Sequence, residues 1–195
     1  MIQDFDPTAD NFGVVAEHPE LIDINGDVQG PSPEELEQIR RQGFAGSGED
    51  AEPATDSDLM YSNAVAYHPG LDQIVISVHD YHELWVIDHS TTTEEVAGHS
   101  GGRYGRGGDL LYRWGNPRAD GRGSEADRKM GGQHDARWIP DGMPGAGHIM
   151  VFSNNAPGPD GPYTIVYEIA TPMNSDGHYE LPGNGPFGPT ESVWS

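Results

Sequence analysis

The sequence contains no cysteine, and it has no apolar run long enough to cross a bilayer. A disulfide framework, a thiolate metal site and a cysteine nucleophile are therefore excluded. The first residues lack the basic-then-apolar pattern of a signal peptide, so the sequence predicts no membrane insertion and carries no recognisable export signal. A chain of 195 residues is long enough for one domain with a substantial core.

Lysine is almost absent, since Lys129 is the single example. The 32 acidic residues outnumber the 10 basic ones, and the formal net charge is -22. Such a surface repels nucleic acids and anionic membranes, so neither is an expected partner. Abundant carboxylates with so few lysines favour a halophilic protein, in which salt screens the self-repulsion. The alternative is an acidic exterior that binds calcium.

Long helices are also expected to be scarce, because the 27 glycines and 16 prolines favour many turns. Residues 1–60 read as an irregular, acidic segment that contains one helix, at 32–42. That helix has a capping box, a proline at its first position and a glycine stop, formed by Ser32, Glu35, Pro33 and Gly43. Residues 61–195 form the second part of the chain, and it is rich in strands.

This second part repeats itself. The segment Ser62–Pro69 aligns without a gap on Gln133–Pro140, which places Asn63 opposite His134. Each copy continues into two further strands and then into a segment that contains a tryptophan. The expected strands are Tyr61–Tyr67, Gln73–Val78, Glu83–Ile87, Asp109–Trp114, His148–Ser153 and Thr164–Ile169, with a last segment at Ser192–Trp194. Four strands per repeated unit predict an all-β protein of the β-propeller type, with about two blades present. An ordinary meander or sandwich is the alternative.

The stretch Gly131–Pro140 carries the most distinctive candidate residue, His134. In a propeller the inner strand of each blade begins beside the central channel, so His134, Asn63, Tyr61 and Ser62 would face one funnel. A histidine there can act as a nucleophile or a proton carrier near neutral pH. The alternative is that His134 only hydrogen-bonds a neighbouring turn.

Other polar segments allow more than one interpretation. The loop Gly101–Gly108 combines glycines with Arg103 and Arg106, which suits a sulfate or phosphate but also a solvated surface loop. His79 and His82 would point to opposite faces if they lay in a strand, so a shared metal is not expected. We expect no cofactor. The turn expected at Ser153–Asn155 offers Asn155 as a polar contact.

Several motifs resemble the arylsulfotransferase (aryl-sulfate sulfotransferase) family. They are Leu71–Ile74, Glu83–Glu95, Gly101–Tyr104, Gly107–Pro117 and Gly132–Ala136. The resemblance extends over nearly all of the chain and is most specific between Asp72 and Pro117. It implies a six-bladed propeller that moves a sulfuryl group from a phenolic ester to another phenol through a sulfohistidine. Further histidines and an arginine would surround the transferred group.

On this resemblance His134 is the active-site histidine, as nucleophile or as supporting residue, and Tyr61, Asn63, Arg103, Arg106 and Asn155 are candidates for substrate binding. The partners would be aryl sulfates and phenols, and relatives are commonly exported to the periplasm or beyond.

The sequence also departs from the family pattern. Tyr61 stands where a histidine is expected, Ala156–Gly158 stands where an arginine is expected, and about four blades are missing. We therefore expect a fragment of the full enzyme. A non-catalytic propeller that binds a partner is the alternative, and a quinoprotein dehydrogenase-like propeller is a weaker third.

Overall fold

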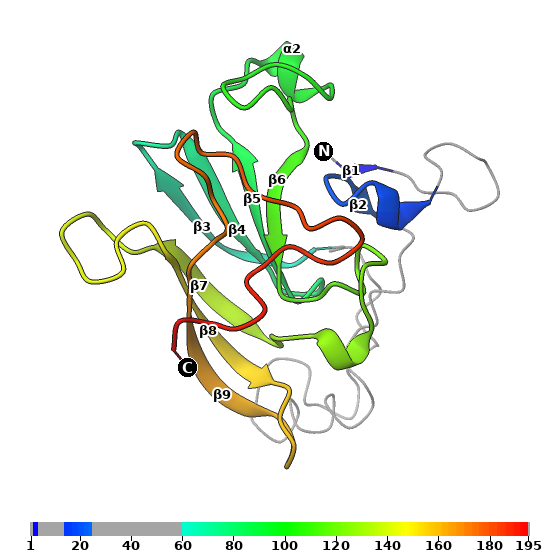
Figure 1. The fold of residues 1–195 in the computed structure, drawn as a ribbon, viewed down its shortest axis with the longest axis vertical. Helices are drawn as coiled ribbons and strands as arrows, with labels where there is room; N and C mark the ends of the chain where they lie inside the picture. The colour runs from blue at the N-terminus through cyan, green and yellow to red at the C-terminus, as the bar shows by residue number, and fades with distance from the viewer. Residues whose placement is uncertain (1, 4–13, 25–59, 195) are drawn as a thin grey trace, which may run out of the picture.

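The structure is a computed structural model, and it describes residues 2–3, 14–24 and 60–194. Its described part consists mainly of two antiparallel sheets, with only short helical turns, so the prediction of an all-β chain is confirmed (Figure 1). The helix expected at 32–42 lies outside the described residues. No described helix is long and apolar enough to cross a membrane.

The first sheet is a four-stranded meander with the order β3-β4-β5-β6. Its strands are β3 (Ser62–His68), β4 (Gln73–Val78), β5 (Glu83–Asp88) and β6 (Leu110–Trp114). These bounds agree with the sequence prediction to within one residue at each end. The long connection from β5 to β6 carries one short helix, α2 (Thr93–Val96), which begins with a capping box formed by Thr92 and Glu95.

The second sheet repeats this connection with three strands in the order β7-β8-β9. They are β7 (Gln133–Trp138), β8 (Ile149–Ala156) and β9 (Tyr163–Ile169). The expected fourth segment is present only as an isolated antiparallel bridge from Trp194 to Glu168 of β9, beside which the amide of Val193 donates to the Glu168 carbonyl at 2.8 Å. The turn expected at Ser153–Asn155 is absent, because these residues continue β8 through a break in register between Ser153 and Ala156.

The apolar run in β5 shows why the first sheet is covered on both faces. Successive side chains of a strand point to opposite faces. Leu84 and Val86 belong to the main core, which they share with β4, β6 and all three strands of the second sheet. Trp85 points the other way, into a smaller core with Val78, Tyr81 and Ile22. A continuous apolar run is therefore required here, and each fully buried large side chain contributes about 1.5–3 kcal/mol through the hydrophobic effect.

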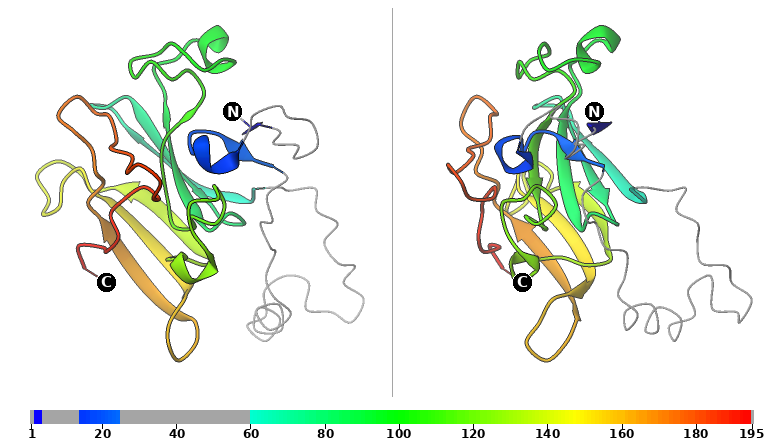
Figure 2. Two further views of the ribbon diagram at one scale, coloured as in Figure 1. Left: turned by 45° about the vertical axis from the view of Figure 1, so that its right-hand side comes forward. Right: turned by 90° about the vertical axis from the view of Figure 1, so that its right-hand side faces the viewer.

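Two segments without long strands complete these cores. Residues 14–24, which include η1 (Val15–Glu17) and β2 (Ile22–Asp23), lie against the first sheet, and β2 pairs in parallel with β1 (Ile2–Gln3). The segment after β9 runs back across β6 (Figure 2). There the Tyr112 hydroxyl donates to the Gly188 carbonyl at 2.7 Å, and the Trp114 indole donates to the Pro189 carbonyl at 2.8 Å. Figure 1 shows the first strands of the two sheets, β3 and β7, near each other, and β7 contacts both β3 and β4.

Candidate functional site

The two positions aligned by the sequence repeat meet in space. The amide nitrogen Nδ2 of Asn63 lies 3.0 Å from Nδ1 of His134, and it also donates to the carbonyl oxygen of Gln133 at 2.8 Å. Both strands are irregular at this point, with a register shift between Ser62 and Ala64 in β3 and another after His134 in β7. Bulges of this kind re-aim a side chain, and here they direct Asn63 towards the start of the neighbouring sheet.

Two further histidines lie close to this pair. His79 and His82 belong to the tight turn between β4 and β5, in which the amide of His82 donates to the His79 carbonyl at 3.0 Å. The ring centroids of His79 and His82 are 6.4 Å apart, and those of His79 and His134 are 5.9 Å apart. Both residues lie between the expected strands Gln73–Val78 and Glu83–Ile87, where the chain reverses, so the alternation of side chains along a strand does not apply to them.

We call Tyr61, Asn63, His79, His82 and His134 the histidine cluster. Tyr61 packs edge-on against His79, with ring centroids 5.1 Å apart, and the residue is 51% exposed. The cluster therefore combines imidazole rings with an aromatic surface that is open to solvent.

The backbone around the histidine cluster is strained. Among the described residues, four that are not glycine have positive φ, and Tyr61 (φ 43), His82 (φ 55) and Asp135 (φ 56) belong to or adjoin the histidine cluster. This conformation costs a residue with a Cβ roughly 1–2 kcal/mol, and such strain concentrates at functional sites. The fourth, Asp72, lies in the β3–β4 turn at the far end of the sheet.

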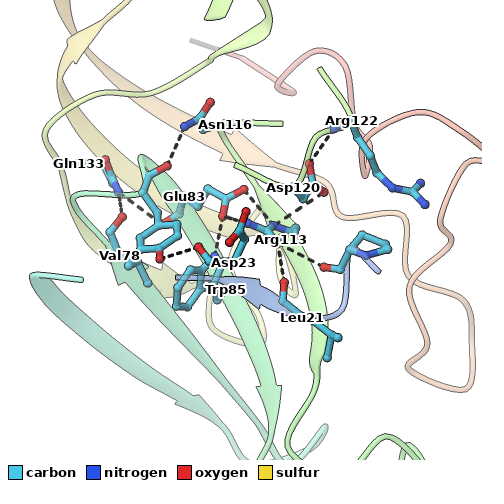
Figure 3. A network of polar contacts seen from close by, with 12 residues as sticks. Leu21, Asp23, Val78, Glu83, Trp85, Arg113, Asn116, Asp120, Arg122 and Gln133 are labelled. Carbon is cyan, nitrogen blue, oxygen red and sulfur yellow. Dashed lines mark hydrogen bonds and ion pairs between the residues drawn. The ribbon is translucent and has the colours of Figure 1, made fainter. Parts of the chain in front are cut away.

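Gln133 anchors the histidine cluster to the protein interior. Its amide nitrogen donates to the Val78 carbonyl at 2.7 Å and to the Glu83 carbonyl at 3.3 Å (Figure 3). The Gln133 side chain is fully buried, so the chain entering β7 is held against the turn that carries His79 and His82. A hydrogen-bonded, buried anchor of this kind fixes the relative position of His134 and that turn.

A buried ion network lies directly behind this anchor. Arg113 donates through Nε to Glu83 Oε1 at 3.0 Å and through a second nitrogen to Oε2 at 2.5 Å. Asp120 lies 3.9 Å from the same guanidinium, which also donates to the Leu21 carbonyl at 3.0 Å (Figure 3). Burial raises the pKa of Glu83 to about 6, and Arg113 acts in the opposite direction.

The electrostatics of His134 favour its neutral form. Burial lowers the pKa of the His134 imidazole below its ordinary value, and the nearby His79 lowers it further. His79 is itself held by its neighbour in sequence, since its Nδ1 lies 2.8 Å from Oδ1 of Asp80. A neutral imidazole near pH 7 can hydrogen-bond, attack an electrophile or exchange a proton.

The structure does not bring the two arginines to the histidine cluster. The Arg103 guanidinium donates to the Gly70 carbonyl at 3.0 Å, in the turn before β4, whereas His79 follows the end of β4. A six-residue strand separates these ends by on the order of 15–20 Å. Arg106 lines a small cavity of about 70 Å³ together with Tyr104 and His178.

Asn155 is brought closer. Its backbone N–H donates to the Gly131 carbonyl at 2.8 Å. A Cβ built on Gly132 would lie 3.0 Å from the side-chain nitrogen of Asn155. Asn155 thus lies beside the two glycines that lead into His134, without a direct bond to that histidine among the contacts of the described residues.

Among the described residues, no group of three or more histidine, aspartate or glutamate side chains could hold a metal ion. A cavity of about 280 Å³ lies on the other side of the buried ion network, between β6 and the proline-rich C-terminal segment, and is lined by Glu83, Arg113, Trp114 and Phe187 among others.

Sequence reasoning missed His79 and Asp80 as members of this site. The order of the strands could have indicated them, because β3 and β4 are antiparallel neighbours. The turn that follows β4 must therefore lie beside the start of β3, which holds Asn63.

No protein-family model, no curated protein and no solved structure matches the chain.

Proposed function

We propose that the chain is part of an arylsulfotransferase-like β-propeller enzyme, which moves a sulfuryl group from an aryl sulfate to a phenol through a sulfohistidine. The pair of adjacent imidazole rings of His79 and His134, 5.9 Å apart and held by separate polar partners, carries this proposal. Sulfuryl transfer through histidine needs a neutral nucleophilic nitrogen, together with donors that meet the charge developing on oxygen.

The architecture supports a propeller, with each sheet as one blade. Both sheets are antiparallel meanders, and their first strands carry irregularities at the aligned positions Asn63 and His134. The contact of β7 with β3 and β4 is what neighbouring blades would make near a central channel. Two blades cannot close a ring, so further blades would complete the enzyme.

The substrate would meet an aromatic and amide surface. Tyr61 is exposed and offers a ring against which a phenol can pack. Asn155 lies at the start of β7 and offers an amide group, whereas both hydrogens of the Asn63 amide are used by Gln133 and His134. Because Arg103 lies at the opposite end of β4, sulfuryl oxygens would be bound by neutral donors of the histidine cluster in this part of the protein.

A propeller that binds a partner without catalysis is the second candidate. Tyr61, in place of the expected histidine, and Ala156–Gly158, in place of the expected arginine, favour it. Under this alternative the histidine cluster would be a polar binding surface with no turnover.

Replacement of His134 by alanine tests the enzyme proposal. Phenolate release from a chromogenic aryl sulfate, with a second phenol as acceptor, would be followed in molar salt. We expect a loss of about 100-fold or more, because a positioned acid–base or donor group contributes on the order of 10²–10⁴ in rate. The matched control is His178→Ala, at an exposed histidine on the C-terminal segment. Absence of turnover in the unmodified chain and in a version extended by further blades would favour the binding alternative.

A further inference from the structure

We propose that His79 is the histidine that accepts the sulfuryl group, and that His134 is a hydrogen-bond donor that remains unsulfurylated. This division of roles rests on the proposed sulfuryl transfer. It follows from the hydrogen bonds that fix which nitrogen of each ring carries the proton.

The contacts of Asn63 fix the tautomer of His134. The Gln133 carbonyl oxygen can only accept, so the Asn63 atom that lies 2.8 Å from it must be the amide nitrogen. The same nitrogen lies 3.0 Å from Nδ1 of His134 and has a second hydrogen to give. Nδ1 of His134 therefore accepts, and the proton of the neutral ring resides on Nε2.

Asp80 fixes the opposite tautomer of His79. A carboxylate only accepts hydrogen bonds, and Oδ1 of Asp80 lies 2.8 Å from Nδ1 of His79. The proton of His79 therefore resides on Nδ1, and Nε2 keeps its lone pair. Of the two adjacent rings, His79 presents the nucleophilic nitrogen and His134 presents an N–H group.

Solvent access fits this division. The His79 and Asp80 side chains are 26% and 35% exposed, so a substrate can approach the ring while the carboxylate holds it. Asp80 acts on the substrate only through His79 and is a positioning residue.

The bonds in the first half-reaction balance without any other reactant. The lone pair on Nε2 of His79 forms the N–S bond while the bond between sulfur and the phenolic oxygen breaks. The electron pair of that bond leaves on the phenolate, to which His134 Nε2–H donates a hydrogen bond without losing its proton. The ring of His79 then carries a positive charge, and the Asp80 carboxylate stabilises it.

The second half-reaction regenerates the enzyme. The oxygen of the acceptor phenol attacks sulfur, the N–S bond breaks, and its electron pair returns to Nε2 of His79. The proton of the acceptor phenol leaves to solvent. Both His79 and His134 end with the protonation they had at the start.

Nitrogen NMR tests the tautomers independently of activity. Long-range ¹H–¹⁵N spectra of the histidine rings, recorded on the full chain at pH 8, distinguish a protonated ring nitrogen from one with a lone pair. We expect a proton on Nε2 of His134 and on Nδ1 of His79. The reverse assignment on either ring would overturn the division of roles. The Asp80→Ala variant, which removes the acceptor, should lose the Nδ1–H preference of His79 and leave the tautomer of His134 unchanged.

Trapping the covalent intermediate tests the chemistry. The chain is mixed with an aryl sulfate and no acceptor, digested at alkaline pH, and mapped by mass spectrometry. We expect one sulfuryl group on His79 in the unmodified chain, the same label more slowly in His134→Gln, and none in His79→Gln. A label on His134 would overturn only the assignment of roles. No label on any histidine, in the chain and in a version extended by further blades, with both tautomers as expected, would overturn the sulfuryl-transfer function itself.

Discussion

The side-chain amide of Asn63 joins β3 to β7. Its nitrogen lies 2.8 Å from the Gln133 carbonyl oxygen and 3.0 Å from Nδ1 of His134. Both acceptors belong to β7, so this one side chain of β3 sets the protonation pattern and the position of His134. The arrangement favours the neutral ring, since a proton on Nδ1 would face a donor.

Replacement of Asn63 by aspartate should reverse that preference. A carboxylate beside Nδ1 stabilises the protonated ring, so we expect the pKa of His134 to rise above its lowered value. The measurement is an NMR titration of the His134 ring protons. The matched control is Asn155→Asp, which adds the same charge near Gly132 without a bond to His134. An equal rise in both variants would show that the contact with Asn63 is not responsible.

His134 should also make folding depend on pH. Its pKa is lower in the folded protein than the ordinary value of 6.5, so the unfolded chain binds more protons in the window between these values. The contribution of His134 to stability is therefore fully present above about pH 6.5 and is lost as the pH falls through the lowered pKa. We expect His134→Gln to flatten the fall in the free energy of unfolding between pH 7 and pH 5, measured by urea denaturation. The matched control is His178→Gln, at an exposed histidine.

Much of the fold could be predicted from local patterns. Turn residues and β-branched runs set the strand bounds of the first sheet, and the continuous run Leu84–Ile87 indicated a strand with both faces covered. The repeat that aligned Asn63 with His134 also indicated that they lie close together, because equivalent positions of adjacent repeated units stack on each other.

The rest of the site depends on where the chain reverses. His79 and His82 lie in a turn, where the alternation of side chains along a strand does not predict the direction in which each side chain points. The loop with Arg103 follows β5, so its position depends on the end at which β5 finishes, and that end is remote from His134. The extension of β8 through Asn154 and Asn155 depends on a bulge, and the residue types at these positions do not predict one.

The ion pair between Glu83 and Arg113 should matter to stability as a unit. Removing one partner of a buried pair leaves the other charge unpaired, which costs about 3–5 kcal/mol. We expect Arg113→Met to lower the free energy of unfolding by this amount at pH 8, above the pKa of about 6, where the Glu83 carboxylate is ionised and would be left without its cation. The control is Arg137→Met at an exposed position of β7, with an expected change within about 0.5 kcal/mol.

Replacement of Glu83 itself by glutamine should change how stability depends on pH. The pKa of Glu83 is raised in the folded protein from 4.5 to about 6, so its proton stabilises folding below about pH 4.5, and this stabilisation is lost as the pH rises through 6. The difference in the free energy of unfolding between Glu83→Gln and the unmodified chain should therefore change across this window. A difference that is constant from pH 4 to pH 8 would contradict the raised pKa.

The net charge of -22 should make stability depend strongly on salt. At 1 M salt the screening length falls to about 3 Å, so repulsion among surface carboxylates is largely removed. We expect the Tm to rise by about 5 °C or more between 0.1 M and 2 M KCl, followed by circular dichroism. Calcium chloride at millimolar concentration and constant ionic strength separates the alternative, because a chain that binds calcium would gain stability there without molar salt. A Tm that does not rise in KCl would exclude the halophilic interpretation, and a rise with calcium alone would replace it with a calcium-binding exterior.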